Sequence, residues 1–207
     1  SAETNDEIQQ IAQEVSPLLT EFASKISQNE QLFSRIKKVY DEKDHYSLNE
    51  EQKMLLEETY KGFVRNGALL NDEKKEQLKN INIELSKKSL QFGQNVLAAT
   101  NQYYKHLTNK EDLAGIPEAI LAQYEEEAKE RNLNVLGCIG NTRSSIEPFL
   151  TFSNRRNLRE KAFDIFVKRG DNKNENDTNE TLVSILELRA EKAKILGFAN
   201  FAEWSLS

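Results

Sequence analysis

The chain has 207 residues and a formal net charge of −6, and its length fits one domain or at most two. The excess of acidic residues argues against a nucleic-acid backbone or an anionic membrane as the main partner. No stretch approaches about 18 uncharged apolar residues, so no membrane span is expected. The single cysteine, Cys138, excludes an internal disulfide and any multi-cysteine zinc site.

The first seven residues are polar and acidic and carry no visible secretory signal. We therefore expect a cytoplasmic protein, or a periplasmic one if a signal peptide has been removed.

Three helices are predicted in the first 70 residues, because apolar residues recur every three or four positions. Pro17 falls inside the first helix, where its ring removes a backbone donor, so we expect a kink or a break. Ser47 followed by Glu50 indicates a capping box that opens the third helix, which should end near Asn66–Gly67. The predicted apolar faces are Ile8, Ile11, Val15, Leu18, Phe22 and Ile26; Leu32, Phe33, Ile36, Val39 and Tyr40; and Met54, Leu55, Tyr60, Phe63 and Val64.

The longest predicted helix spans residues 72–100, with Asn71 as its N-cap. At about 1.5 Å per residue it would be about 43 Å long, so we expect it to form the spine of the protein. Gly93 inside it costs about 1 kcal/mol relative to alanine, which favours close packing by another helix at that point. Its predicted buried stripe is Leu78, Ile81, Leu85, Phe92, Val96 and Ala99.

The pattern changes after residue 101. Segments 102–107 and 134–139 are short and aromatic or apolar, and we predict that they pair as a small ribbon. Pro117 fits the first turn of a helix between them. Further helices are predicted over about 146–152, from about Arg155, from a capping signal at Asp177 and Glu180 to Gly197, and from Asn200. The fold class is therefore all-α, an irregular multi-helix bundle with one long spine helix and a short two-stranded ribbon.

These later helices are also predicted from their apolar residues. Phe201 and Trp204, in the last of them, are expected to stay partly exposed and to support weak self-association. The apolar positions of the earlier ones are Ile120, Leu121, Tyr124 and Ala128; Ile146, Phe149, Leu150 and Phe152; Leu158, Ala162, Ile165 and Phe166; and Leu182, Ile185, Leu186, Ala193 and Leu196.

Side chains that could hold a metal or act as nucleophiles are few. The two histidines, His45 and His106, lie far apart, and no His-Glu-x-x-His motif is present, so no zinc site is expected. His45 lies near Asp41 and Asp44, which we interpret as an exposed turn rather than a weak metal site. Cys138 lies in an apolar run and is interpreted as a buried, inert thiol.

Serines and glycines give no catalytic motif either. Ser144 and Ser145 lack a Gly-x-Ser-x-Gly elbow, and Gly137 and Gly140 alone do not make a phosphate-binding loop. The polar loop 171–177 resembles a calcium loop, but Lys173 stands where an oxygen ligand is needed, so we interpret it as a solvated loop.

Two runs of charge remain: a basic one, Arg155, Arg156, Arg159 and Lys161, and an acidic one, Glu125, Glu126 and Glu127. The basic run could bind an anion such as a peptide carboxylate, but Glu160 and Asp164 relieve it, and we interpret it as a charged outer face. The acidic run is interpreted as a solvated helix face. Residue chemistry alone thus predicts no catalytic and no metal-binding residue, and it leaves substrate-binding residues unassigned.

Seven segments, taken in order, carry a family resemblance. They are residues 63–70 (FVRNGALL), 91–97 (QFGQNVL), 113–117 (LAGIP), 143–150 (RSSIEPFL), 159–162 (REKA), 169–172 (RGDN) and 188–198 (LRAEKAKILGF). The ordered set resembles the N-terminal part of bacterial peptidyl-dipeptidases, in the zinc oligopeptidase family that includes oligopeptidase A and thimet oligopeptidase. The resemblance covers nearly the whole chain.

The resemblance implies that residues 1–207 are the N-terminal helical domain of a larger peptidase and form one wall of a deep channel. The family's zinc site, His-Glu-x-x-His plus a later glutamate, belongs to the catalytic C-terminal part. We expect that part to be absent here, so no catalytic or zinc-binding residue is carried over to any position. The parent enzyme would use zinc, take short peptides as substrates and release C-terminal dipeptides, with its catalytic part as the partner of this domain. The alternative is a stand-alone helical protein-binding or adaptor domain without catalysis.

Overall fold

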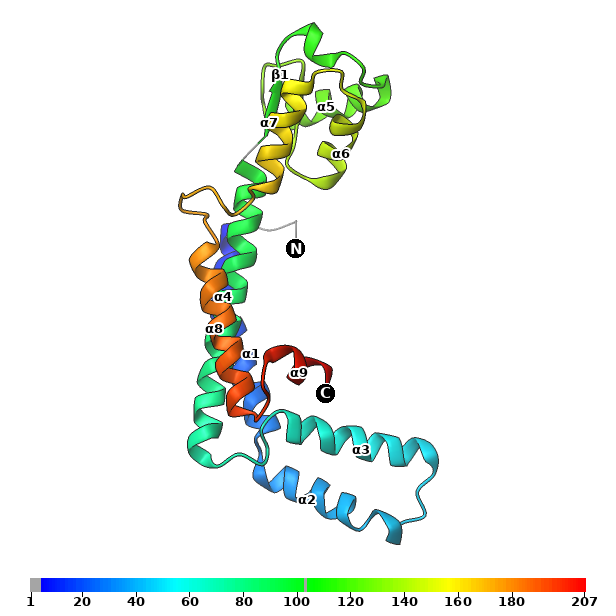
Figure 1. Ribbon diagram of the computed structural model, residues 1–207, viewed down its shortest axis with the longest axis vertical. Helices are drawn as coiled ribbons and strands as arrows, with labels where there is room; N and C mark the ends of the chain where they lie inside the picture. The colour runs from blue at the N-terminus through cyan, green and yellow to red at the C-terminus, as the bar shows by residue number, and fades with distance from the viewer. Residues whose placement is uncertain (1–4, 103) are drawn as a thin grey trace. The chain divides into compact units, whose positions relative to one another are not determined.

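The computed structural model describes residues 5–102 and 104–207. The chain is mainly helical with one small antiparallel sheet, as predicted (Figure 1). It divides into two compact units: unit 1 comprises the chain up to Gln91 together with Thr181–Ser207, and unit 2 comprises Phe92–Glu180. In the described ranges, no helix combines the length and apolar composition that crossing a bilayer requires.

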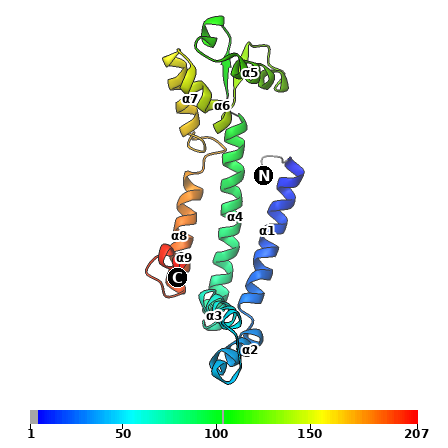
Figure 2. The same cartoon turned by 90° about the vertical axis from the view of Figure 1, so that its right-hand side faces the viewer.

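Unit 1 is built from long helices. These are α1 (Asp6–Ser27), α2 (Glu30–Asp41), the 3₁₀ turn η1 (Lys43–His45), α3 (Glu50–Arg65), the first two thirds of α4 (Asp72–Gln102), most of α8 (Asn179–Ile195) and α9 (Phe201–Leu206). Figure 2 shows α1 running beside α4. Asn71 caps α4 by accepting the backbone N–H of Lys74 at 2.9 Å, and α4 is the longest helix, as predicted.

The packed face of α1 differs from the predicted one. The helix approaches α4 through small hydroxyl side chains: Ser16 Oγ lies 2.6 Å from Ser86 Oγ, and Ser24 is buried. Small residues let two helix backbones come close, which explains why this face is chosen. The predicted apolar face is instead exposed, with 41–63% of each side chain accessible at Ile8, Ile11, Val15, Leu18, Phe22 and Ile26.

Helices α2 and α3 form a hairpin around aromatic rings. The ring of Phe33, which is buried, stacks on Tyr60 and Phe63 at 5.7 and 5.9 Å, and Tyr40 stacks on Tyr60 at 3.9 Å. This stack uses the predicted apolar positions of both helices. Four other predicted positions are exposed instead: Leu32 and Val39 on α2, and Met54 and Leu55 on α3.

Two local predictions in the first hundred residues are wrong, and a third, the kink or break at Pro17, is wrong for the break. The capping box of α3 is formed by Asn49 and Gln52, not by Ser47 and Glu50, because Asn49 is the residue in extended conformation directly before the first helical turn. Pro17 does not break α1, which continues through it. Gly93 is not a point of close packing, since a Cβ there would meet nothing within 4 Å.

The end of α3 and the buried stripe of α4 agree better with the predictions. Gly67 follows Asn66 with φ of +92°, the left-handed conformation that ends α3 as predicted. Leu78, Ile81 and Ala99 of the predicted stripe are buried. Leu85, Phe92 and Val96 are half-buried.

Unit 2 contains the predicted ribbon. Strand β1 (Lys105–Leu107) pairs antiparallel with β2 (Gly137–Ile139), with Lys105 opposite Ile139 and Leu107 opposite Gly137. The strands are shorter than predicted, and residue 103 of the predicted segment lies outside the described residues. Around the ribbon lie η2 (Lys110–Leu113), α5 (Glu118–Glu130), α6 (Arg143–Phe152) and α7 (Arg156–Val167).

The core of unit 2 fills the space between the ribbon and these helices. The ring of Tyr124 meets the ring of Phe149 edge-on at 6.4 Å. Most of the predicted apolar positions of α5, α6 and α7 are buried or half-buried, but Phe152 of α6 is 44% exposed. Pro117 occupies the N-cap of α5, one position before the predicted first turn. The buried cluster consists of Leu107, Ile116, Tyr124, Ile139, Ile146, Phe149, Leu158 and Ala162.

Helix α8 ends and α9 begins as predicted, whereas α8 starts at Asn179, so that Thr178 and not Asp177 directly precedes it. Gly197, with φ of +85°, ends α8, and Asn200 caps α9 by accepting the backbone N–H of Glu203 at 3.0 Å. On α8 only part of the predicted apolar set is buried: Ile185 and Ala193 are, whereas Leu182 and Leu186 are exposed. The helix therefore keeps an apolar surface open.

Candidate functional site

A polar cleft of about 490 Å³ lies on unit 2 between α5 and the segment that leads into α6. Its central group is the carboxylate of Glu127. One turn earlier on the same face of α5, Tyr124 enters the core, so the helix directs Glu127 toward the loop after β2. We call this hollow the Glu127 cleft; it is lined by Gln123, Tyr124, Glu126, Glu127, Glu130, Arg131, Thr142, Ser144 and Ser145.

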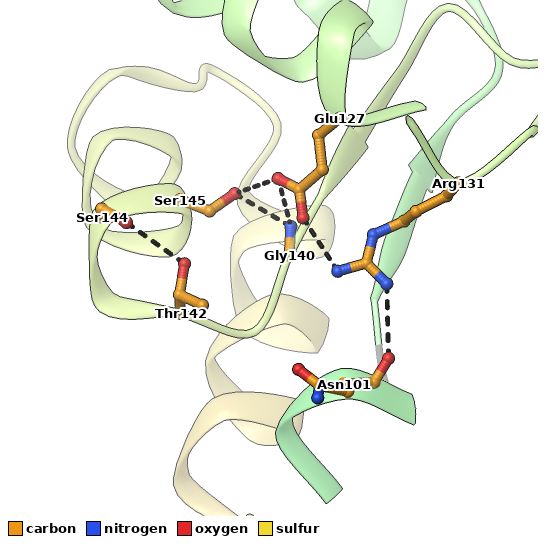
Figure 3. Close-up of polar contacts among 7 residues, drawn as sticks. All are labelled: Asn101, Glu127, Arg131, Gly140, Thr142, Ser144 and Ser145. Carbon is orange, nitrogen blue, oxygen red and sulfur yellow. Dashed lines mark hydrogen bonds and ion pairs between the residues drawn. The ribbon is translucent and has the colours of Figure 1, made fainter. Parts of the chain in front are cut away.

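The carboxylate of Glu127 accepts hydrogen bonds from both sides of the cleft (Figure 3). Its Oε2 accepts from Ser145 Oγ at 3.0 Å and from the backbone N–H of Gly140 at 3.3 Å. Its Oε1 accepts from Arg131 Nη2 at 3.1 Å. The Gly140 N–H is shared, since it also donates to Ser145 Oγ at 2.9 Å.

Gly140 leaves room for this close approach. A Cβ at position 140 would lie 2.1 Å from Glu127 Oε1, well inside van der Waals contact. The glycine therefore serves a carboxylate of the same chain and not a phosphate loop.

Arg131 holds the other side of Glu127. Its Nη1 donates to the backbone oxygen of Asn101 at 3.3 Å, and its guanidinium lies over the ring of Tyr104, 4.8 Å from the centroid. A guanidinium that makes an ion pair, a backbone contact and a cation–π contact is fixed in orientation. The polar network thus connects the end of α4 with α5 and the segment before α6.

The buried hydroxyl and thiol beside the network are kept neutral. Burial raises the pKa of Tyr124, whose hydroxyl donates to the backbone oxygen of Ser145 at 2.8 Å. Burial likewise raises the pKa of the Cys138 thiol to about 11. Cys138 is fully buried, so the interpretation as an inert thiol agrees with its position.

The contacts of Glu127 are those of a structural anchor. The Glu127 carboxylate accepts from three groups of the same unit, namely Ser145, Gly140 and Arg131. Ser145 is turned to Glu127, while Ser144 Oγ lies 3.2 Å from Thr142 Oγ1 on the exposed side. The two serines flagged in the sequence therefore have different partners.

The interpretation of Glu125–Glu127 as a solvated face is wrong for one of the three. Glu125 and Glu126 are exposed and pair with Lys129, at 3.0 and 3.8 Å. Glu127 points inward, with 22% of its side chain exposed. The signal that could have found it is its spacing, three residues after Tyr124 and one before Ala128, both buried.

The basic run does not come together as one anion site. Arg155 lies 3.4 and 3.6 Å from the carboxylates of Glu111 and Asp112, and Arg159 donates to the backbone oxygen of Ser153. Arg156 and Lys161 are exposed. Two of the four cations thus stabilise local structure and two face solvent.

The remaining sequence candidates are placed apart from the cleft. His45 is exposed on η1, and Asp41 pairs with Lys37. The loop after Gly170 is closed by its own contacts, with Thr178 N–H donating to Gly170 O at 2.7 Å and Asp177 accepting from Lys173 N–H at 2.8 Å. Across residues 5–102 and 104–207, no three His, Cys, Asp or Glu side chains are grouped so that they could hold a metal ion.

Comparison with known proteins extends the resemblance found in the sequence. The profile of peptidase family M3 matches residues 149–207. Dipeptidyl carboxypeptidase of Escherichia coli is 32% identical over 207 residues, an alignment covering 100% of this chain and 30% of that protein. Oligopeptidase A of Salmonella typhimurium is 31% identical over 214 residues, covering 100% and 31%.

A plant relative shows a similar identity and a similar coverage of the two chains. Probable cytosolic oligopeptidase A of Arabidopsis thaliana is 30% identical over 207 residues, covering 97% of this chain and 29% of that protein. The chain thus spans about 30% of the length of the curated relatives that it matches, in their N-terminal portion. On these matches, the chain belongs to peptidase family M3, that of the oligopeptidases A and the dipeptidyl carboxypeptidases.

Proposed function

We propose that residues 1–207 are the N-terminal helical domain of a zinc-dependent peptidyl-dipeptidase or oligopeptidase, and that they form a wall of the channel admitting short peptides. The observation that carries the proposal is the coverage: relatives from bacteria and a plant align with nearly all of this chain through only about 30% of their own length. In this proposal the remaining part of the enzyme contains the catalytic centre.

The histidines of this chain do not fit a zinc site. His45 and His106 belong to no group of three metal-ligating side chains in the part of the chain that the structure describes. Zinc, when held by the rest of the enzyme, would activate the water that attacks the peptide bond. The contribution of this chain is then to restrict access and to support the catalytic part, and the isolated chain is inactive.

The exposed face of α1 supports a partner within the same enzyme. Six large apolar side chains recur at helical spacing on this face and are 41–63% exposed, for instance Leu18 and Phe22 at 63%. A continuous apolar stripe of this kind favours an interaction surface over solvent. The relatives have more than twice as much polypeptide outside the aligned region as inside it, and we assign that polypeptide as the occupant.

The compartment is proposed from the relatives. One Arabidopsis relative is described as cytosolic and another as chloroplastic or mitochondrial. We propose a cytoplasmic location for this protein.

Sequencing the gene beyond the codon for Ser207 tests the proposed function. We expect an open reading frame that continues into a His-Glu-x-x-His motif and a later glutamate. The complete product should bind about one zinc ion per chain and release C-terminal dipeptides from short peptides, measured by metal analysis and mass spectrometry, whereas residues 1–207 alone should do neither. A stop codon shortly after Ser207 would overturn the proposal in favour of the adaptor alternative.

A further inference from the structure

Two cations of α8 lie over the two aromatic rings of α9 in unit 1. Arg189 lies 4.9 Å from the ring centroid of Phe201, and the Lys192 ammonium lies 4.1 Å from that of Trp204. Arg189 and Lys192 are three residues apart on α8, and Phe201 and Trp204 are three residues apart on α9. The two cation–ring contacts therefore lie about one helical turn from each other. Figure 2 shows α9 beside the C-terminal end of α8.

A third cation reaches the same indole from the end of α3. The Arg65 guanidinium lies 5.2 Å from the Trp204 ring centroid, and Trp204 Nε1 donates to the backbone oxygen of Arg65 at 3.0 Å. This hydrogen bond fixes the ring between the helices. Two positive charges, Arg65 and Lys192, therefore lie at one anchored, half-buried indole. The third, Arg189, lies at the Phe201 ring, whose centroid is 5.0 Å from that of Trp204.

No side-chain carboxylate in the described ranges forms an ion pair with any of these three cations, although surface cations elsewhere commonly have one. The nearest acid on α9, Glu203, is turned to the start of its own helix, where it accepts from Ala199 N–H at 3.2 Å. Burial and the neighbouring Arg65 charge lower the pKa of Lys192. The cluster is thus positive and partly desolvated, and no side-chain carboxylate is paired with it in the part of the chain that the structure describes.

The donors still available belong to Arg189 and Lys192. The fork of Arg65 is occupied, since Nη1 donates to Ser207 O at 2.8 Å and Nη2 to Ser205 O at 3.2 Å. Arg189 is exposed and can offer its planar fork to an oxyanion, while Lys192 adds a point charge. We infer that Arg189 and Lys192, backed by Arg65 and Trp204, form an oxyanion-binding site.

The oxyanion can come from two sources: the carboxylate of an acidic side chain on another polypeptide segment, or a phosphate group of a small molecule. The chemistry of recognition is the same in both cases, a guanidinium fork plus an ammonium. The inference does not depend on the proposed peptidase role, because it concerns only contacts within unit 1.

Trp204 is the only tryptophan in the chain, so its fluorescence reports on this site alone. The 207-residue protein is titrated with sodium phosphate and, separately, with N-acetylglutamate amide, each at constant ionic strength against sodium chloride. We expect a saturable emission change with at least one of them. Tighter binding of phosphate assigns a small-molecule source, and tighter binding of the glutamate analogue assigns a polypeptide source.

Substitutions separate binding from general charge effects. Lys192→Met and Arg189→Gln should each weaken the binding at least tenfold. Lys194→Met removes the same charge from an exposed position of α8 outside the cluster and should leave the binding unchanged. Arg189→Gln alone suffices if Lys192→Met does not fold. A linear response equal to that of chloride, or equal effects of Lys192→Met and Lys194→Met, would show that the cations only stack on the rings.

Discussion

The two units of this chain bury their apolar residues to very different extents. In unit 2 a ribbon and three helices enclose a contiguous core with Leu107 and Phe149 at 0% exposure. In unit 1 one whole face of α1 is exposed, and a largely apolar groove of about 450 Å³ is open between α2 and α3. Among the described residues, the large apolar side chains that are exposed in unit 2 are Leu136, Phe152, Phe163 and Val167. The other exposed large apolar side chains belong to unit 1.

This difference indicates how each unit is stabilised. Burying apolar surface supplies most of the free energy of folding, at about 25 cal/mol per Å², so unit 2 can account for its stability with its own side chains. Unit 1 relies on long helices, aromatic stacking in the α2–α3 hairpin and polar contacts between α1 and α4. Its apolar faces are available for another part of the enzyme, in agreement with the proposed function.

The largest expected effect is in the core of unit 2. Phe149→Ala should lower the free energy of unfolding by about 3–5 kcal/mol, because it removes a fully buried ring that contacts Tyr124. Urea unfolding followed by circular dichroism measures the change. Phe152→Ala, at a 44% exposed position of the same helix, is the control and should cost less than half as much. Equal losses would mean that the described core does not dominate the stability of unit 2.

A smaller effect is expected in the polar network of the same unit. Glu127→Gln keeps the shape of the side chain but replaces a carboxylate that accepts from Ser145, Gly140 and Arg131. The loss should be about 1–3 kcal/mol, since a hydrogen-bonded charged group is removed. Glu126→Gln changes the same charge at an exposed position and should stay within about 0.5 kcal/mol. Similar values for the two variants would contradict the anchoring role of Glu127.

Unit 2 should also be sensitive to alkaline pH. Burial raises the pKa of Cys138 from 9.0 to about 11, so the folded state holds the thiol proton more tightly than the unfolded state does. Its contribution to stability is therefore complete below pH 9 and is lost as the pH rises toward 11. Unfolding free energies measured from pH 8 to 11 should fall less steeply in Cys138→Ala than in the unaltered protein. Parallel pH profiles would show that the thiol has no such role.

The smallest effect is expected on the open face of α1. Phe22→Ser should change the free energy of unfolding of the 207-residue chain by less than about 1 kcal/mol, because the ring is 63% exposed. Ser24→Leu, two residues later on the packed face, should cost about 1–3 kcal/mol by overpacking. Thermal and urea unfolding of both variants compare the two faces. The opposite ranking would show that α1 packs through its apolar face after all.

Local chemistry explains why so many boundaries could be predicted from the sequence. An asparagine before a helix or a glycine after it acts through its own backbone and the next turn, as at Asn71, Gly197 and Asn200. The start of α3 shows the limit of such predictions. Ser47 and Asn49 can both accept a hydrogen bond at a helix N-terminus, and the backbone conformation of the folded chain decides that Asn49 is the cap.

Packing partners could not be predicted in the same way. Periodicity shows that α1 has an apolar face, but it does not show whether this chain covers that face. The long-range contact of Ser16 with Ser86 leaves no local pattern. Glu127 stands in a run of three acids; its spacing from Tyr124 places it toward the packed side of α5, but its contact with Gly140, a residue in another segment, leaves no local pattern.

Hydrogen exchange of the isolated 207-residue chain tests the contrast between the units most directly. Backbone amides that are protected by a packed core exchange only through extensive unfolding, whereas those of a helix with an open apolar face exchange through local opening. The account predicts that the amides of α5 and α6 exchange at least a hundredfold more slowly than those of α1, measured by mass spectrometry of peptic fragments at neutral pH. Equal protection of α1 and α6 would contradict it, because α1 would then be as firmly held within this chain as the core of unit 2.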